Sequence, residues 1–83
     1  MTNELIERFV EADERNGKPV SISFRKRKSI NGIFIQGRDY EELKAKNFWR
    51  IVSELNLEEW KKTGDLSLAR LFSGGDFLKL NNL

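Results

Sequence analysis

Apolar and polar residues alternate strictly between Val20 and Phe24, where the sequence reads VSISF. This period of two places the apolar side chains on one face of a β-strand and the serines on the other. The segment INGIFI at positions 30–35 is more densely apolar, which is typical of a strand covered on both faces. We therefore expect two strands, joined by a turn, between Pro19 and Gly37.

A helical spacing of apolar residues precedes these strands. Leu5, Ile6, Phe9 and Val10 form one stripe, and charged residues occupy most other positions from 3 to 15. Asn16-Gly17, followed by Pro19, is a typical helix end. The sequence predicts an amphipathic helix over residues 3–15 that packs on the sheet.

Two further elements are predicted after Gly37. Asp39 is a candidate N-cap with Glu42 three residues later, a pairing that satisfies backbone amides at the start of a helix. A short surface helix is expected from Tyr40 to about Lys46, ended by Asn47. Residues 48–52, FWRIV, are rich in aromatic and β-branched side chains and predict a third strand.

The last third of the chain is less clearly patterned. Asn56 is a candidate cap for a short helix that ends at Thr63-Gly64. Asp65 could cap another helix over residues 66–72, although the apolar spacing there also fits a strand. We favour the helix because Ser73-Gly74-Gly75 resembles a helix stop. The residues that follow predict a short apolar tail docked on the core: Phe77, Leu78 and Leu80.

These elements predict an α+β fold with an N-terminal helix, a small, mostly antiparallel sheet of about three strands, and short C-terminal helices. The chain has 83 residues, and we expect residues 1–83 to form a single domain. This length is near the lower end at which a hydrophobic core suffices without disulfides or metals.

The chain contains no Cys and no His. Disulfides, the ordinary zinc sites and catalysis by a Cys nucleophile or a His base are therefore excluded. The first residues do not resemble a secretory signal, and no apolar run is long enough for a membrane span. We expect a cytoplasmic protein with no membrane contact, no cofactor and no metal.

An enzyme is the weakest class of function for this sequence. The acid pairs Glu41-Glu42 and Glu58-Glu59 are adjacent in sequence, so their carboxylates point in different directions on a helix. Gly74-Gly75-Asp76 lacks the Lys-Ser/Thr ending of a phosphate-binding loop. We therefore expect a non-catalytic binding module.

A cluster of four cations marks the turn between the first two strands: Arg25, Lys26, Arg27 and Lys28. A protruding basic tip of this kind can bind the phosphates of a nucleic acid. Arg38 and Arg50 would extend the positive face, together with Lys44 and Lys46, if the third strand lies beside the first two. The alternative is a solvated charged turn that prevents edge pairing between strands.

Two aromatic residues near these cations have two interpretations. An exposed Trp49 or Tyr40 would offer a platform on which a base could stack. The alternative is that Trp49 fills the core. For Trp60 we expect a helix side chain that caps the sheet.

A protein–protein interaction or self-association module is the second hypothesis. A sheet of three strands leaves two free edges, and the apolar run Ile33–Ile35 would favour pairing with another chain or a second copy. A homodimer would also bury more apolar surface for so small a chain. The sequence identifies neither the binding target nor the oligomeric state.

The segments PVSISF at 19–24 and NGIFIQG at 31–37 resemble the PVSI and NGI-x-LQG strands of the bacterial Sm-like RNA chaperone. A short helix precedes the first strand in both, and the resemblance covers the first 37 residues. It implies a small SH3-like barrel, a ring oligomer and binding of single-stranded RNA. The residues RKRKSI separate the two matched strands, and no segment matches the family's Tyr-Lys-His motif, so no pore residue is carried over. The whole chain also resembles small bacterial proteins without an assigned function, which implies no activity.

Overall fold

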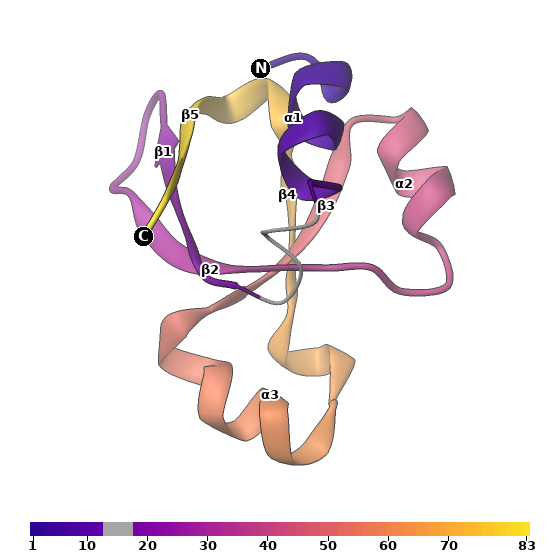
Figure 1. Ribbon diagram of the computed structural model, residues 1–83, viewed down its shortest axis with the longest axis vertical. Coiled ribbons are helices and arrows are strands. Elements are labelled where there is room, and N and C mark those ends of the chain that lie inside the picture. Colours follow the sequence, from indigo (N-terminus) through magenta and orange to yellow (C-terminus); the bar gives the residue numbers. More distant parts are fainter. Residues whose placement is uncertain (13–17) are drawn as a thin grey trace.

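The computed structural model of the chain describes residues 1–12 and 18–83, which form three α-helices and five β-strands (Figure 1). The helices are α1 (Asn3–Val10), α2 (Tyr40–Ala45) and α3 (Leu57–Thr63). The strands are β1 (Val20–Phe24), β2 (Ile30–Ile35), β3 (Phe48–Ser53), β4 (Arg70–Ser73) and β5 (Phe77–Asn82). Short 3-10 helices connect some of these elements: η2 (Glu54–Asn56), η3 (Leu66–Leu68) and η4 (Gly74–Asp76).

All five strands belong to one antiparallel sheet with the order β4-β3-β2-β1-β5. The two edge strands, β4 and β5, are joined by the three residues of η4. In a flat sheet these edges would lie about 19 Å apart, whereas three residues of 3-10 helix advance only about 6 Å. The sheet is therefore rolled, and the rings of Phe24 on β1 and Phe72 on β4 approach within 5.5 Å across its interior.

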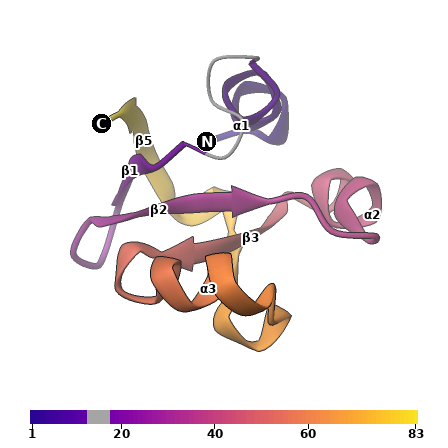
Figure 2. The same cartoon turned by 60° about the horizontal axis from the view of Figure 1, so that its bottom comes forward.

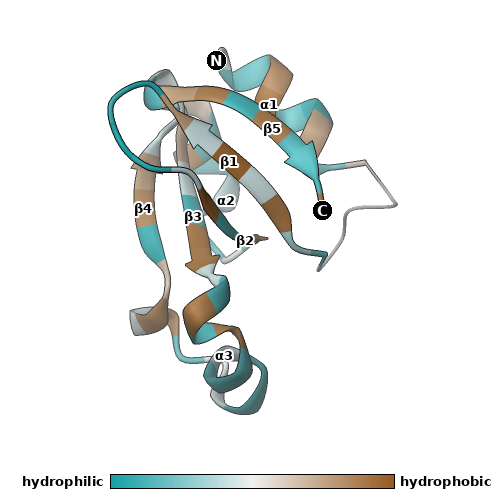
Figure 3. Cartoon of the chain, turned by 90° about the vertical axis from the view of Figure 1, so that its left-hand side faces the viewer, coloured by the Kyte–Doolittle hydropathy of each residue, from teal (hydrophilic) through white to brown (hydrophobic). Residues whose placement is uncertain are grey.

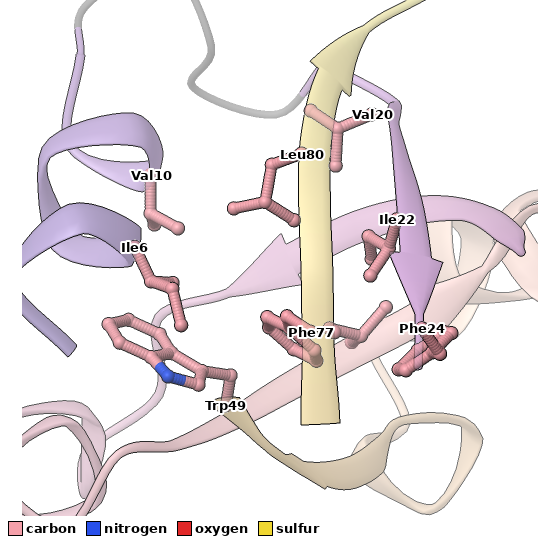
Figure 4. Close-up of a cluster of buried hydrophobic side chains, with 9 residues drawn as sticks. Ile6, Val10, Val20, Ile22, Phe24, Trp49, Phe77 and Leu80 are labelled. Atoms are coloured by element: carbon pink, nitrogen blue, oxygen red, sulfur yellow. The ribbon is translucent and has the colours of Figure 1, made fainter. Parts of the chain in front are cut away.

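The rolled sheet encloses most of the hydrophobic core, and α1 lies against it (Figure 4). The α1 side chains of Ile6 and Val10 point toward Trp49 and Leu80. Full burial of an aliphatic side chain such as Ile6 stabilises the fold by about 1.5–3 kcal/mol. This packing explains why an eight-residue helix is stable here, since a helix of that length is marginal in isolation.

Asn47 links three parts of the chain at the top of the core. It ends α2 in the left-handed conformation, with φ of 61°, which Asn tolerates better than most residues. Its side chain accepts a hydrogen bond from the indole N–H of Trp49 (2.9 Å) and donates one to the carbonyl of Met1 (3.2 Å). Its own carbonyl accepts from the backbone N–H of Gly74 (2.8 Å). A side chain at Gly74 would overlap the Asn47 side-chain oxygen, so only Gly fits this position.

The other face of the sheet is partly covered by the segment between β3 and β4. Figure 2 shows α3 beneath β3, on the side away from α1. Ile33 and Val52 pair across β2 and β3, and both are buried although neither belongs to the central core cluster. The outer face of β2 is thus covered at Ile33, whereas Ile30, Phe34 and Ile35 are only half-buried.

Several predicted elements are confirmed with small changes in their bounds. The strand over Val20–Phe24 buries alternate residues, α2 begins at Tyr40, β3 begins at Phe48, and Gly64 ends α3 in a left-handed conformation. The N-terminal helix ends at Val10, which is shorter than the predicted span of 3–15. The predicted stop at Asn16-Gly17 lies outside the described residues.

The prediction of about three strands is wrong, because the α+β fold contains a five-stranded sheet. Residues 66–72 were expected to form a helix, but they form η3 and then β4, which pairs with β3. Asp65 does cap η3, by accepting a hydrogen bond from the amide of Ser67 (2.9 Å). The expected helix stop at Ser73-Gly74-Gly75 is instead the connection between β4 and β5.

The predicted C-terminal tail is β5, which pairs along the whole of β1. The register shifts between Ser23 and Phe24, so that Leu78 is displaced from the alternating pattern. Phe77 and Leu80 are therefore both buried although they are three residues apart, and Leu78 is 59% exposed. Because the shift breaks the period of two, the sequence pattern did not mark this segment as a strand.

Candidate nucleic-acid interface

The β1–β2 loop, residues 25–29, carries the four consecutive cations, and all four side chains are exposed. The loop is held at both ends. The backbone N–H of Arg25 donates to the carbonyl of Asp76 in η4 (3.0 Å), and the Ser29 hydroxyl donates to that of Ser23 (3.5 Å). Figure 3 shows this hydrophilic loop projecting from the ends of the strands. A cationic loop fixed at its base can meet a phosphate backbone without a change in the core.

Arg27 differs from the other cations of the loop. Its guanidinium carbon lies 5.2 Å from the ring centroid of Phe24 and 5.4 Å from that of Phe72. At these distances the cation is attracted by both ring faces. Arg27 therefore anchors the loop to β1 and β4, and leaves Arg25, Lys26 and Lys28 as the outer cations.

Arg38 and Arg50 lie at the other end of β2. Arg50 is paired with Ile35, and β2 separates this pair from the loop by about 17 Å. The Arg50 guanidinium forms two hydrogen bonds with the carboxylate of Asp39, at 3.0 and 2.8 Å. Arg38 is exposed beside this ion pair. The structure thus brings the four loop residues together and places Arg38 and Arg50 at a separate position.

Asp39 occupies the predicted N-cap position of α2 but makes no side-chain hydrogen bond to the helix. Its carboxylate is engaged by Arg50 instead. The predicted capping pair with Glu42 is therefore wrong, although the helix begins where it was expected.

Neither candidate aromatic platform faces the loop. Trp49 is buried in the core, with 1% of its surface exposed, which answers the question the sequence left open. The Tyr40 ring packs edge-on against Trp49 with centroids 6.0 Å apart. The Tyr40 hydroxyl donates to the carboxylate of Glu11 (2.7 Å).

Lys44 is also occupied, because it joins α1 to α2. Its Nζ lies 3.0–3.2 Å from three carboxylates, those of Glu7, Glu11 and Glu41. The hydrogen bond from Tyr40, followed by that from Lys44, lowers the pKa of the Glu11 carboxyl. The hydrogen bond with Glu41 is the largest cause that raises the pKa of Lys44. This helix interface is an acidic network that would repel phosphate.

Charge is distributed unevenly between the strands around the loop and the rest of the chain. Residues 18–35 and 77–83, which include β1, β2 and β5, hold six of the 15 cations and none of the 13 acids. The net charge of +2 therefore divides into +6 on these segments and −4 on the remainder. Figure 1 shows the β1–β2 loop and α2 on opposite sides of the molecule. The cationic loop and the acidic α1–α2 interface therefore lie apart in space, although Asp76 of η4 adjoins the base of the loop.

Polar side chains line the outer face of β1, together with the residues of β2 and β5 that pair with it. Ser21 pairs with Asn31 on β2 and Asn81 on β5, and Ser23 pairs with Lys79. Paired residues share a face of the sheet, and the alternate residues of β1 point into the core. In Figure 3, β1 and β5 face the viewer with no helix of the described chain in front of them. This face was not predictable from the sequence because it depends on the strand register, although the absence of acids from residues 18–35 is a feature of the sequence alone.

An open recess adjoins the loop where β2 begins and β3 ends. Its volume is about 380 Å³, and six residues line it: Ser29, Ile30, Asn31, Ser53, Glu54 and Leu55. The pairing of Gly32 with Ser53 brings these two chain segments together. Glu54 is the one acid among these six residues.

The described residues show neither a metal site nor a membrane span. Among residues 1–12 and 18–83, no group of three or more acidic side chains is arranged to hold a metal ion. No helix in this part of the chain has the length and apolar character needed to cross a membrane.

Comparisons of this chain with protein-family models, with curated proteins and with solved structures gave no match.

Proposed function

We propose that this protein is a non-catalytic module of the cytoplasm that binds nucleic acid through the β1–β2 loop. The observation that carries the proposal is the segregation of charge, with six cations and no acid on the segments that form β1, β2 and β5. Polyanions bind such surfaces by releasing counterions, and the affinity then depends strongly on salt. The acidic α1–α2 side would keep a bound strand on the loop side.

Single-stranded RNA is the first ligand to test. The resemblance of the first 37 residues to the bacterial Sm-like RNA chaperone supports this choice, and the rolled sheet is compatible with the small barrel that the resemblance implies. None of that family's pore residues is used in the proposal. The binding residues proposed here are Arg25, Lys26 and Lys28, with Arg27 as the anchor of the loop.

The test compares two variants of equal net charge. One variant changes Arg25, Lys26 and Lys28 to Ala, and its control changes three exposed lysines elsewhere to Ala: Lys46, Lys61 and Lys62. Both variants carry a net charge lower by three, so a general loss of positive charge affects them equally. Binding of a fluorescent RNA or DNA strand is measured by anisotropy between low and moderate salt.

For three phosphate contacts with a single strand, we expect the wild-type affinity to fall about 18-fold when the salt concentration rises fourfold. The loop variant should lose most of its affinity at low salt, and the control should remain within about twofold of the wild type. Equal losses in the two variants, or no binding by the wild type at low salt, would contradict the proposal.

Self-association is the second candidate, favoured by the two edges of the sheet. Within the described chain, β4 and β5 each pair on one side only, whereas the apolar run Ile33–Ile35 lies on the central strand β2. Each edge strand carries an exposed leucine, Leu71 at 51% and Leu78 at 59%. Free strand edges with apolar side chains favour pairing between chains.

Light scattering of the wild type and of Leu71→Lys and Leu78→Lys variants tests this candidate. A larger wild-type mass that both variants reduce would support self-association through the edges. A monomer at all concentrations would exclude it.

A further inference from the structure

The recess beside the loop has the position and the polar groups of a nucleobase subsite. Ser29 lines the recess and directly follows Lys28, the last cation of the loop. A strand with a phosphate on Lys28 would therefore hold its adjacent base at the mouth of the recess. The volume of about 380 Å³ is within the range of small-ligand sites, about 300–1,000 Å³.

The side chains of the recess offer free hydrogen-bonding groups. Asn31 carries both a donor and an acceptor, and the Glu54 carboxylate accepts only. Neither side chain forms a hydrogen bond or ion pair with another residue in the described part of the chain. Leu55, which is 89% exposed, provides an apolar surface against the face of a base.

The position of Glu54 is informative because an acid next to a phosphate-binding loop weakens the attraction of a polyanion. A carboxylate is, however, a suitable acceptor for the exocyclic amino group of a base, and Asn pairs well with the edge of adenine. Uracil and thymine have no amino group, and their one donor on this edge, N3–H, lies between two carbonyl oxygens, which a carboxylate repels. The recess therefore favours bases that carry an amino group.

We propose that this recess binds one unpaired base with an exocyclic amino group, from a single strand whose phosphates lie on the β1–β2 loop. This inference rests on the proposed function, and it adds a base preference that phosphate binding alone does not provide. The base must be unpaired because its hydrogen-bonding edge faces Asn31 and Glu54.

The experiment measures the affinities of adenine, cytosine and uracil homopolymers of equal length by fluorescence anisotropy at one salt concentration. The wild type should bind the adenine and cytosine strands about fivefold or more tightly than the uracil strand. Glu54→Gln tests the charged acceptor, because the amide that replaces the carboxylate accepts more weakly and also donates. Glu58→Gln is its control, because Glu58 is an exposed acid on α3 outside the recess.

The two substitutions remove the same charge, so simple electrostatics predicts that both raise the affinity for every strand. The base subsite predicts a different result for Glu54→Gln. Its affinity for the adenine and cytosine strands should fall about fivefold, and its affinity for the uracil strand should not fall.

The outcomes distinguish the two proposals. Salt-dependent binding without base preference, or an equal gain for all strands in Glu54→Gln, would overturn the base subsite and leave the proposed function standing. A preference for uracil would also overturn it. If no strand binds to the wild type at low salt, both proposals fail.

Discussion

Arg27 should contribute to stability, unlike the cations beside it. Its guanidinium lies 5.2 and 5.4 Å from the ring centroids of Phe24 and Phe72. These residues belong to β1 and β4, which are not neighbours in the sheet. Each contact of this kind at an exposed site contributes about 0.5–1 kcal/mol. We therefore expect Arg27→Ala to lower the free energy of unfolding by about 1 kcal/mol, which is about 4–8 °C in melting temperature for a chain of this size.

Thermal unfolding followed by circular dichroism checks this value, with Lys26→Ala as the matched control. Lys26 is exposed and has no ring contact within residues 1–12 and 18–83, so its substitution should change stability by less than about 0.5 kcal/mol. Arg27→Lys keeps the charge but loses the planar group that stacks on the rings. It should melt below the wild type and still bind RNA within about twofold of it. If Arg27→Ala and Lys26→Ala melt at the same temperature, the contacts of Arg27 with the two rings do not stabilise the fold.

Two further predictions concern the core and the interface between the helices. Gly74→Ala should lower the free energy of unfolding by about 1–3 kcal/mol in urea, because the new methyl group overlaps its neighbours. Gly75→Ala, whose nearest neighbouring atom lies 3.5 Å away, should have almost no effect, and equal losses would contradict the packing described. The hydrogen bond from Tyr40 lowers the pKa of Glu11 below 4.5. This hydrogen bond therefore stabilises the fold fully above pH 4.5, and the stabilisation is lost as the pH falls through the lowered pKa of Glu11. Between neutral pH and about pH 3, the melting temperature of Tyr40→Phe should therefore fall less than that of the wild type. An equal fall in both proteins would contradict a stabilising hydrogen bond from Tyr40 to Glu11.

Elements with a regular local pattern were predictable from the sequence. The strand over Val20–Phe24 alternates without interruption, and the helix at Tyr40 begins where acidic residues cluster. The last two strands were not predictable, because β4 has only four residues and β5 contains the register shift near Leu78. Their conformation is determined by pairing with β3 and β1, which are distant in sequence.

The candidate site was predictable only in part. The four cations of the loop are consecutive, so the sequence alone located them. The anchoring of Arg27 depends on Phe72, which is 45 positions further along the chain, and the pairing of Arg50 with Asp39 depends on where β3 begins. Lys79 lies beside Ser23 only because β5 pairs with β1. Such neighbours follow from tertiary structure and not from local spacing.

The pairing of β5 with β1 has a consequence for how the protein acquires its structure. The first strand of the sheet, β1, finds one of its two partners only in β5, more than 50 positions further along the chain. A nascent chain can thus form the β1–β2 hairpin early, but Ile22 and Phe24 stay open to solvent until Phe77 and Leu80 have been synthesised. Folding should consequently be slow for so small a protein, in the range of milliseconds to seconds, because it awaits contacts between distant parts of the chain.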